Sequence, residues 1–366
     1  MKGQWLGRFE GTNTGDLMME FDEFDDHFEG RAYAFEQDHR MPSTVAFIRT
    51  KDKAEQFEME VPLFPLNPRT LDQTEWEYLA PQFPGVIFPT RAKVAFNRSD
   101  DECSVTWESD IGTNGSATAR RSNASRPSTL VPLPITTWEE FRKHFQSQQS
   151  YRYVFRGQEN NVWRLQTSFH RTQRSDLVRY LAVDINALHG TLSSLTKHFF
   201  VLSDPIQNAA FMSLVQHHGY PTPLLDWTYS PFIAAYFAFK QAKVHDEKVR
   251  IFMLDLDRWT GTLNQLSKVQ PARPHFSIIR AAALDNPRMV PQQALSSVTN
   301  VEDIEEYIQQ VEKDSGQVYL QAVDLPVAER VTVLKELSAT GIGPGSLFPG
   351  LDGACGQMRD RFFGID

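Results

Sequence analysis

The sequence predicts two domains, an N-terminal all-β meander closed into a barrel or a sandwich, and a C-terminal α+β domain. The 366 residues exceed the usual size of one domain. Short runs that alternate apolar and polar residues dominate 4–112, and helical patterns appear only later. Residues 113–135 are rich in Gly, Ser, Asn, Arg and Pro, which is typical of an exposed connection. We therefore expect an acidic β-rich domain at 1–125, a linker at 126–136 and a second domain at 137–366.

Each run of the N-terminal part is short and ends in turn-forming or acidic residues. Such strands, joined by turns, favour a meander closed into a barrel or packed as a sandwich. A short helix at 74–79 interrupts them. The expected strands are 5–11, 17–24, 27–35, 44–50, 56–61, 86–88 through 94–96, and 103–107.

The second part mixes helices and strands. Thr137 and Glu140 form a capping box that predicts a helix start. We assign Trp138, on the apolar face of that helix, and Trp163 to the core. Other helices are expected at 177–200, at 209–217 and from 325 to 341, and buried strands at 250–256 and 317–323.

The charge argues against nucleic-acid binding by the N-terminal part, and the two cysteines indicate free thiols. Residues 1–125 contain 13 basic and 22 acidic side chains, so the whole net charge of −9 lies there. An acidic surface repels phosphates, so this part is a poor nucleic-acid binder; it is either a solvated face or a site for a protein partner. No apolar stretch is long enough for a membrane span. Cys103 and Cys355 are expected to be buried free thiols in a reducing cytoplasm.

Two segments place polar side chains on stiff backbone. Residues 216–231 carry two histidines, an aspartate, a tryptophan and three serine or threonine hydroxyls among glycine and prolines, just before the apolar run 232–239. Gly and Pro fix backbone angles locally, so these groups are pre-positioned for a ligand. In the run 153–158, a lone arginine, Arg156, follows three apolar or aromatic residues.

These segments belong to a set of four ordered motifs. On them, residues 137–360 resemble the FRG domain family, named after its Phe-Arg-Gly motif, and we expect the C-terminal α+β domain to be an FRG domain. The motifs are Phe155-Arg156-Gly157; His218-Gly219-x-Pro221-Thr222 with Leu224-Leu225-Asp226-Trp227-Thr228-x-Ser230-Pro231; Arg288-Met289-Val290-Pro291-Gln292-Gln293; and Gly341-Ile342 with 347–353.

The resemblance implies a nucleotide site. The FRG pattern is similar to a distant version of the ADP-ribosyltransferase fold, in which an Arg or His, a hydroxyl and a Glu on three strands surround NAD. By this analogy NAD is the expected cofactor, and no metal is expected. The catalytic candidates are Arg156, Ser230, Gln292 and Asp226. The cofactor-binding candidates are Arg156, Gly157, His218, Trp227, Thr228 and Gln293.

Each candidate also has a structural alternative. Arg156 suits phosphate because its donors are planar and bidentate, but it could instead form an internal salt bridge with Asp226. Asp226 is either a functional carboxylate or the cap of a helix that begins near Pro231. Thr228 and Ser230 have the same two roles, and a helix N-terminus with hydroxyls is also a phosphate site.

The remaining candidates also have both a functional and a structural interpretation. His217 and His218 lie at a helix end, where they can bond the last carbonyls, and no further metal ligand is suitably spaced. Trp227 either stacks on a base or belongs to the core.

Gln292 and Gln293 separate two functional hypotheses. Cleavage of the N-glycosidic bond of NAD builds positive charge on the ribose, which a carboxylate stabilises better than an amide. In the first hypothesis Arg156 anchors the nucleotide, Ser230 orients it, and Gln292 or Asp226 stabilises this charge. Glu159 is a further candidate for the carboxylate. The protein then transfers ribosyl groups or hydrolyses NAD, as an effector in bacterial stress or phage defence. In the second, the domain senses a nucleotide or protein without turnover, while the β-domain recruits a partner. A weaker third hypothesis places the ligand in the mouth of a barrel.

Overall fold

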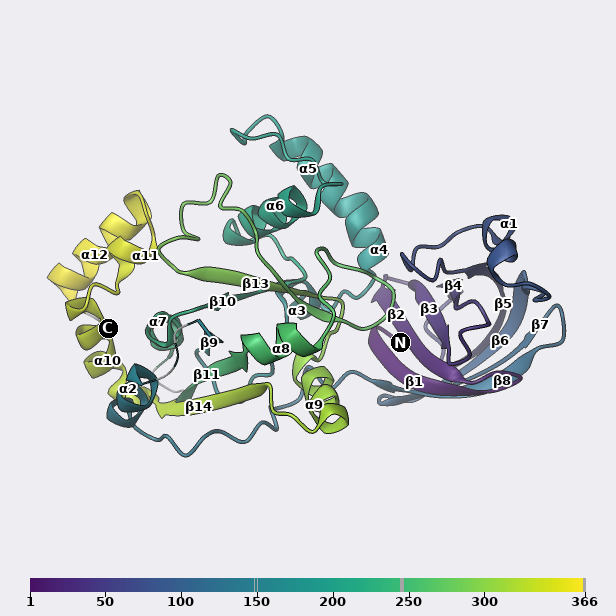
Figure 1. The fold of residues 1–366 in the computed structure, drawn as a ribbon, viewed down its shortest axis with the longest axis horizontal. Coiled ribbons are helices and arrows are strands. Elements are labelled where there is room, and N and C mark those ends of the chain that lie inside the picture. The colour runs from purple at the N-terminus through teal and green to yellow at the C-terminus, as the bar shows by residue number, and fades with distance from the viewer. Residues whose placement is uncertain (148, 150, 244–246, 365–366) are drawn as a thin grey trace.

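The computed structural model describes residues 1–147, 149, 151–243 and 247–364. It contains a closed antiparallel barrel followed by an α+β half built on a six-stranded sheet. Figure 1 shows the barrel, in purple and blue, at one end of an elongated molecule. The expected order, an N-terminal β meander barrel and then an α+β region, is confirmed. Within the described ranges, no helix combines the length and the apolar character needed to cross a bilayer.

The barrel is an up-and-down meander in which each strand pairs with the next. Its eighth strand returns to the first, with Gly7 opposite Ala119, so no sheet edge remains open. The strands at 91–98, 102–109 and 114–121 alternate more and less buried residues, as a barrel wall requires. The strands are β1 (Gly3–Gly11), β2 (Gly15–Glu23), β3 (Phe28–Glu36), β4 (Thr44–Arg49), β5 (Gln56–Pro65), β6 (Arg91–Arg98), β7 (Glu102–Ser109) and β8 (Asn114–Arg121).

The strand that closes the barrel was not expected from the sequence. The stretch 114–121 reads as part of an exposed connection because of its Gly, Ser and Asn content, but it forms β8. Gly115 lies directly under the Trp107 ring, which leaves no room for a Cβ. Small residues therefore let β8 pass close to β7, and ladder closure outweighs the weak strand propensity. After β8, no helix or strand occurs from residue 122 to 137.

Short helical turns, α1 (Trp76–Leu79) and η1 (Ala80–Gln82), lie between β5 and β6, close to the expected helix at 74–79. The two thiols are free, as expected. Cys103 is buried inside the barrel, but Cys355 is exposed, so the expectation that both are buried is wrong for Cys355.

The second half is organised around one antiparallel sheet with strand order β12-β13-β10-β9-β11-β14. The central strands β9 and β10 share only one register pair, Thr228 with Phe155, whereas β9 and β11 share six. The sheet therefore opens between β9 and β10. The strands are β9 (Tyr153–Gln158), β10 (Leu224–Thr228), β11 (Lys248–Asp255), β12 (Phe276–Ile279), β13 (Ala294–Thr299) and β14 (Leu320–Pro326).

Helices cover both faces of this sheet. On one face, the core joins β9, β11 and β14 to α2 (Trp138–Gln146), α7 (Pro231–Gln241) and α10 (Arg330–Ala339). On the other face, α8 (Leu256–Thr262) and α9 (Ile304–Ser315) pack against the sheet. The predicted capping box of Thr137 and Glu140 is present at the start of α2. Trp138 is in the core as expected, but Trp163 is 48% exposed, so its assignment to the core is wrong.

A further group of helices covers the β10, β12 and β13 end of the sheet through a separate apolar cluster. The expected helical region 177–200 ends at Leu192, and its middle turn is a π-helix. These elements are α3 (Ser168–Arg171), α4 (Leu177–Arg179), η2 (Tyr180–Ile185), α5 (Asn186–Leu192) and α6 (Pro205–His217). The chain ends with η3 (Val327–Glu329), α10, α11 (Pro344–Leu347) and α12 (Leu351–Phe363).

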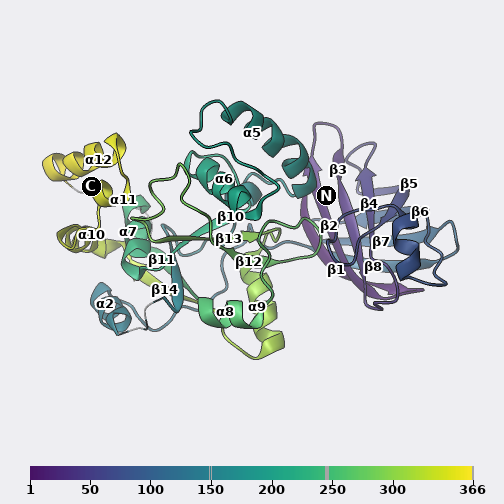
Figure 2. The same cartoon turned by 45° about the horizontal axis from the view of Figure 1, so that its top comes forward.

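The barrel contacts the α+β half through the outer face of β2 and β3, which Figure 2 shows beside α5 and the end of the sheet. Arg31 forms an ion pair with Asp176, with nitrogen–oxygen distances of 2.5 and 2.6 Å. Asp22 accepts from Arg174 at 3.0 Å and from the Ser175 amide at 2.7 Å. Part of the acidic surface of the barrel thus faces basic residues of the same chain.

Candidate functional site

The opening between β9 and β10 is filled by a side chain. One residue beyond the Phe155–Thr228 pair, Arg156 Nη1 donates a 2.8 Å hydrogen bond to the backbone carbonyl of Asp226. The guanidinium thus satisfies a carbonyl that the adjacent strand leaves without a ladder partner. The expected proximity of Arg156 and Asp226 is present, but the contact is to backbone and not a salt bridge to the carboxylate.

One hydrogen-bond donor of Arg156 is unused. Its Nε atom is buried and has no hydrogen-bond partner. The pKa of Arg156 is lowered to about 10, mainly by burial; the Asp226 carboxylate opposes this change, and the neighbouring Arg171 contributes to it. A pKa near 10 keeps the guanidinium protonated at neutral pH. The side chain is therefore a partly desolvated cation with an unused N–H, which favours an anionic ligand.

The Asp226 carboxylate is held by side chains of two other elements. Gln216, on α6, donates to one carboxylate oxygen at 2.5 Å, and Ser296, on β13, donates to the other at 3.5 Å. Gln216 itself accepts from the Thr222 hydroxyl. Asp226 lies within strand β10 and not on a turn, so the expectation that it could cap the next helix is wrong.

A second arginine stands close to this carboxylate. Arg171 is the last residue of α3 and donates to the Gln166 carbonyl at 2.7 Å. Partial burial lowers the pKa of Arg171, and the charge of Asp226 opposes this change. We call Arg156, Arg171, Gln216, Asp226 and Ser296 the Arg156 cluster. It contains two cations and one carboxylate.

The hydroxyls of the second motif bond to backbone. Thr228 is buried and donates to the Gln292 carbonyl at 2.8 Å, which joins the second motif to the third. Ser230 caps α7 by accepting from the Ile233 amide at 3.3 Å. The Gln292 side chain is buried and donates to the Leu347 carbonyl at 3.1 Å. The three motifs therefore meet in space, but Ser230, Thr228 and Gln292 already have structural partners.

Two cofactor-binding candidates belong to the packing of the fold. Trp227 is 2% exposed, donates from Nε1 to Ser297 at 3.0 Å and packs edge-on against Phe276. Its ring faces are in the core, so the expectation of base stacking is wrong. Gly157 faces α7, where a Cβ would collide with the Ala234 carbonyl. Gly157 therefore serves close strand–helix packing and not contact with a cofactor.

The last candidates lie at other surfaces. His218 is the exposed C-cap of α6 and lines a cavity of about 990 Å³ together with Tyr220 and Asn286. Arg156, Ser230 and Gln292 do not line that cavity. Gln293 is exposed with a left-handed φ of 48°. In the described part of the chain, no group of three or more His, Cys, Asp or Glu side chains is placed to hold a metal ion.

Three members of the Arg156 cluster were missed by sequence reasoning. Gln216 precedes the two histidines of the second motif, and its polar side chain among the apolar residues of α6 was a usable signal. Ser296 lies next to Ser297 on β13, a strand that the sequence did not reveal. Nothing in the sequence singles out Arg171.

Comparison with solved structures gives low similarities to three β-barrels. They are a redesigned β-barrel, mFAP1, bound to DFHBI (11% identity, 33% of this chain and 94% of that chain, TM-score 0.23); a second redesigned β-barrel (12%, 33% and 90%, 0.22); and a de novo designed fluorescence-activating β-barrel (17%, 33% and 94%, 0.22). No curated protein matches the chain.

A protein-family model matches the part of the chain that carries the site. The match spans residues 151–247 and includes β9 with Arg156, α3 with Arg171, α6 with Gln216 and β10 with Asp226. These elements supply four of the five members of the Arg156 cluster. The chain contains an FRG domain, matched over residues 151–247.

Proposed function

We propose that the FRG-containing half binds an anionic nucleotide of the NAD type at the Arg156 cluster. The observation that carries this proposal is the buried, unpartnered Nε of Arg156 beside a second arginine. With two cations and one carboxylate, the cluster has an excess of positive charge. A diphosphate offers several acceptors to planar guanidinium donors, and it supplies the missing partner of Nε.

Asp226 is the carboxylate on which ribosyl chemistry at this site would depend. In NAD hydrolysis or ribosyl transfer, the bond between the ribose C1′ and the nicotinamide nitrogen breaks, and the nicotinamide leaves with the bonding electrons. Water or an acceptor nucleophile then adds to C1′ and loses a proton. A carboxylate stabilises the positive charge that builds on the ribose. Asp226 is oriented by Gln216, whereas the Gln292 amide is occupied by Leu347.

Consumption of NAD in the cytoplasm would suit an effector in bacterial stress or phage defence. One observation favours the alternative, a sensor that binds a nucleotide without turnover. Ser230 and Gln292, the expected hydroxyl and third-position groups, are engaged with backbone of the fold. In that case binding would be transmitted to a protein partner, for which the remaining acidic surface of the barrel is the candidate.

The test uses the purified full chain with NAD. Binding is measured by titration calorimetry, and nicotinamide and ADP-ribose are followed by mass spectrometry. For an enzyme, we expect product release that is lost in Asp226→Asn while NAD binding persists. Asp314→Asn, on the exposed end of α9, is the matched control and should change neither. Saturable binding without product supports the sensor, and the absence of any NAD binding contradicts the proposal.

A further inference from the structure

The interior of the barrel is filled at one end and hollow at the other. Near the N-terminus, the large side chains of Trp5, Phe21 and Phe28 are buried and fill it. Toward the other end, several inward positions are alanines, including Ala34 and Ala92. An eight-stranded barrel is just wide enough for side chains to fill it or to hold one small ligand. The alanines leave a cavity of about 160 Å³.

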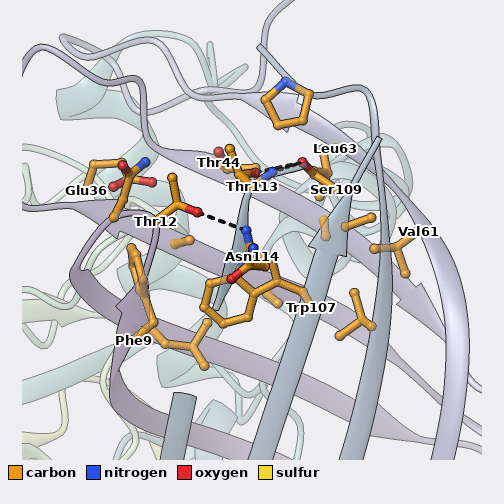
Figure 3. A pocket seen from close by; sticks show the side chains of 18 of the residues that line it. Phe9, Thr12, Glu36, Thr44, Val61, Leu63, Trp107, Ser109, Thr113 and Asn114 are labelled. Atoms are coloured by element: carbon orange, nitrogen blue, oxygen red, sulfur yellow. Dashed lines mark hydrogen bonds between the residues drawn. The ribbon is translucent and has the colours of Figure 1, made fainter. Parts of the chain in front are cut away.

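The wall of this cavity is apolar and partly aromatic. Phe9 and Trp107 meet edge to face, with ring centroids 5.8 Å apart, and Val61 and Leu63 lie across the cavity from them (Figure 3). A cavity of about 150 Å³ with an apolar lining can stay dry and bind benzene. Size and lining therefore fit one aromatic ring or a small fused pair of rings, which can pack against aromatic edges and faces.

One polar group at the mouth has no partner for one of its atoms. Glu36 ends β3, and its Oε2 atom is buried without a hydrogen-bond partner. Burial raises the pKa of Glu36 to about 7; the hydrogen bond from Asn13 opposes this rise, and the charge of Asp38 adds to it. A buried acceptor without a donor is costly, so a ligand that supplies a donor would be stabilised there.

Other polar groups of the mouth form two pairs. The backbone N–H of Asn114 donates to the Thr12 hydroxyl at 3.0 Å, and the hydroxyls of Ser109 and Thr113 are 2.7 Å apart. Figure 3 shows both pairs at the rim, with Thr12 between Glu36 and Asn114. Glu36 differs from these two pairs because one of its buried oxygens has no hydrogen-bond partner.

The mouth lies at the end of the barrel that points away from the α+β half. β1 begins against the α+β half, where the Gln4 side chain donates to the Asn300 carbonyl at 2.8 Å. Thr12, at the mouth, follows the far end of this nine-residue strand. Figure 1 likewise shows the N-terminus on the side of the barrel that faces the α+β half.

We propose that the barrel binds a small planar aromatic molecule that carries one hydrogen-bond donor, with its ring among the alanines beside Phe9 and Trp107 and its donor on Glu36. The site is separate from the Arg156 cluster and takes a ligand of a different class. It does not depend on the nucleotide proposal.

Indole and 1-methylindole are matched probes, because the methyl group removes the donor and leaves the ring system. Titration calorimetry on the full chain should show one site for indole, with about tenfold weaker binding of 1-methylindole, the usual effect of one lost hydrogen bond to a carboxylate. In Glu36→Met, which keeps side-chain bulk without the acceptor oxygens, this preference should disappear. Equal affinities in the wild-type protein, or no binding of indole at millimolar concentration, would overturn the proposal.

A pair of variants on β6 locates the ligand. Ala92→Phe fills the cavity and should abolish binding of both probes, whereas Ala95→Phe, on the outer face of the same strand, should leave binding unchanged. Loss of binding in Ala95→Phe, or its retention in a folded Ala92→Phe, contradicts the assignment. If Ala92→Phe does not fold, the comparison of the two probes in wild type and Glu36→Met still decides.

Discussion

Gly157 packs directly against the backbone carbonyl of Ala234 on α7, with no space for a side chain between them. Because β9 and α7 approach so closely here, Phe155 can join the core below α7 while Arg156 points to the other side of the strand. The glycine of the Phe-Arg-Gly motif thus has a packing role, and the arginine beside it keeps a position at the opening of the sheet.

A Cβ at position 157 should therefore destabilise the protein. Gly157→Ala forces backbone against backbone, and we expect a loss of about 1–3 kcal/mol or more in the free energy of unfolding. The control is Gly190→Ala in α5, where a Cβ meets nothing within 4 Å. There the same substitution should stabilise by about 0.5–1 kcal/mol. Chemical denaturation of both variants provides the measurement, and equal stabilities would contradict the packing role.

Local signals were sufficient for much of the fold. The capping box of Thr137 and Glu140 is a contact between near neighbours, so the sequence could predict the start of α2. The barrel meander followed from alternation along single strands. β10 was missed because Pro221, Pro223 and Pro231 indicate turns, whereas five of the seven residues between the last two prolines form a strand through pairing with β13. That pairing depends on residues about 70 positions away and leaves no local pattern.

The candidate site was predicted only in part, because local motifs indicate its residues but not the long-range contacts between them. Arg156 and Asp226 stand in recognisable motifs, and they do lie side by side. The atoms that meet could not be foreseen, because the single register pair between β9 and β10 is a property of the assembled sheet. Trp163 shows the converse, since an aromatic residue in an apolar context need not be buried.

The contact between the two halves offers a second test. Asp22 is buried and accepts from Arg174 and from two backbone amides. Asp22→Ala leaves those donors without a partner, so we expect a loss of about 1–3 kcal/mol in stability. Asp16→Ala on the same strand removes an exposed pair with Arg8 and should cost about 0.5 kcal/mol or less.

Limited proteolysis reports on the same contact. The segment 122–136, which we predict to contain the linker, has exposed coil but is also bonded to the second half through Ser128 and Glu305 at 2.7 Å. Cleavage there should be faster in Asp22→Ala than in Asp16→Ala. Identical cleavage rates would mean that Asp22 does not hold the two halves together, and cleavage within either half instead would argue against the predicted boundary.

Glu36 predicts a pH dependence of stability. Its pKa is raised from the ordinary 4.5 to about 7, mainly by burial, so the folded state favours the neutral acid. The contribution of Glu36 to the free energy of unfolding is fully present below about pH 4.5. It is lost as the pH rises through about 7. Glu36→Gln, which resembles the neutral acid, should match wild type at pH 4.5 and be more stable at pH 8. Denaturation curves at both values test this, and a difference independent of pH would contradict it.

Arg156 is the residue on which the nucleotide proposal stands. Arg156→Ala removes the unpartnered donor and its charge, and we expect NAD affinity to fall by about tenfold or more, equivalent to roughly 1.5–3 kcal/mol. Arg156→Lys should rescue poorly, because an ammonium cannot reproduce the planar fork. Arg258→Ala, at an exposed position on α8, is the control and should bind like wild type. Arg156→Ala also leaves the Asp226 carbonyl without its partner. We expect this to lower the free energy of unfolding by about 1 kcal/mol, so Arg156→Ala should still fold. Calorimetry and thermal melting on the same samples separate the two roles. A variant that melts far below wild type would show that Arg156 mainly holds β9 to β10, and unchanged NAD binding would remove it from the site.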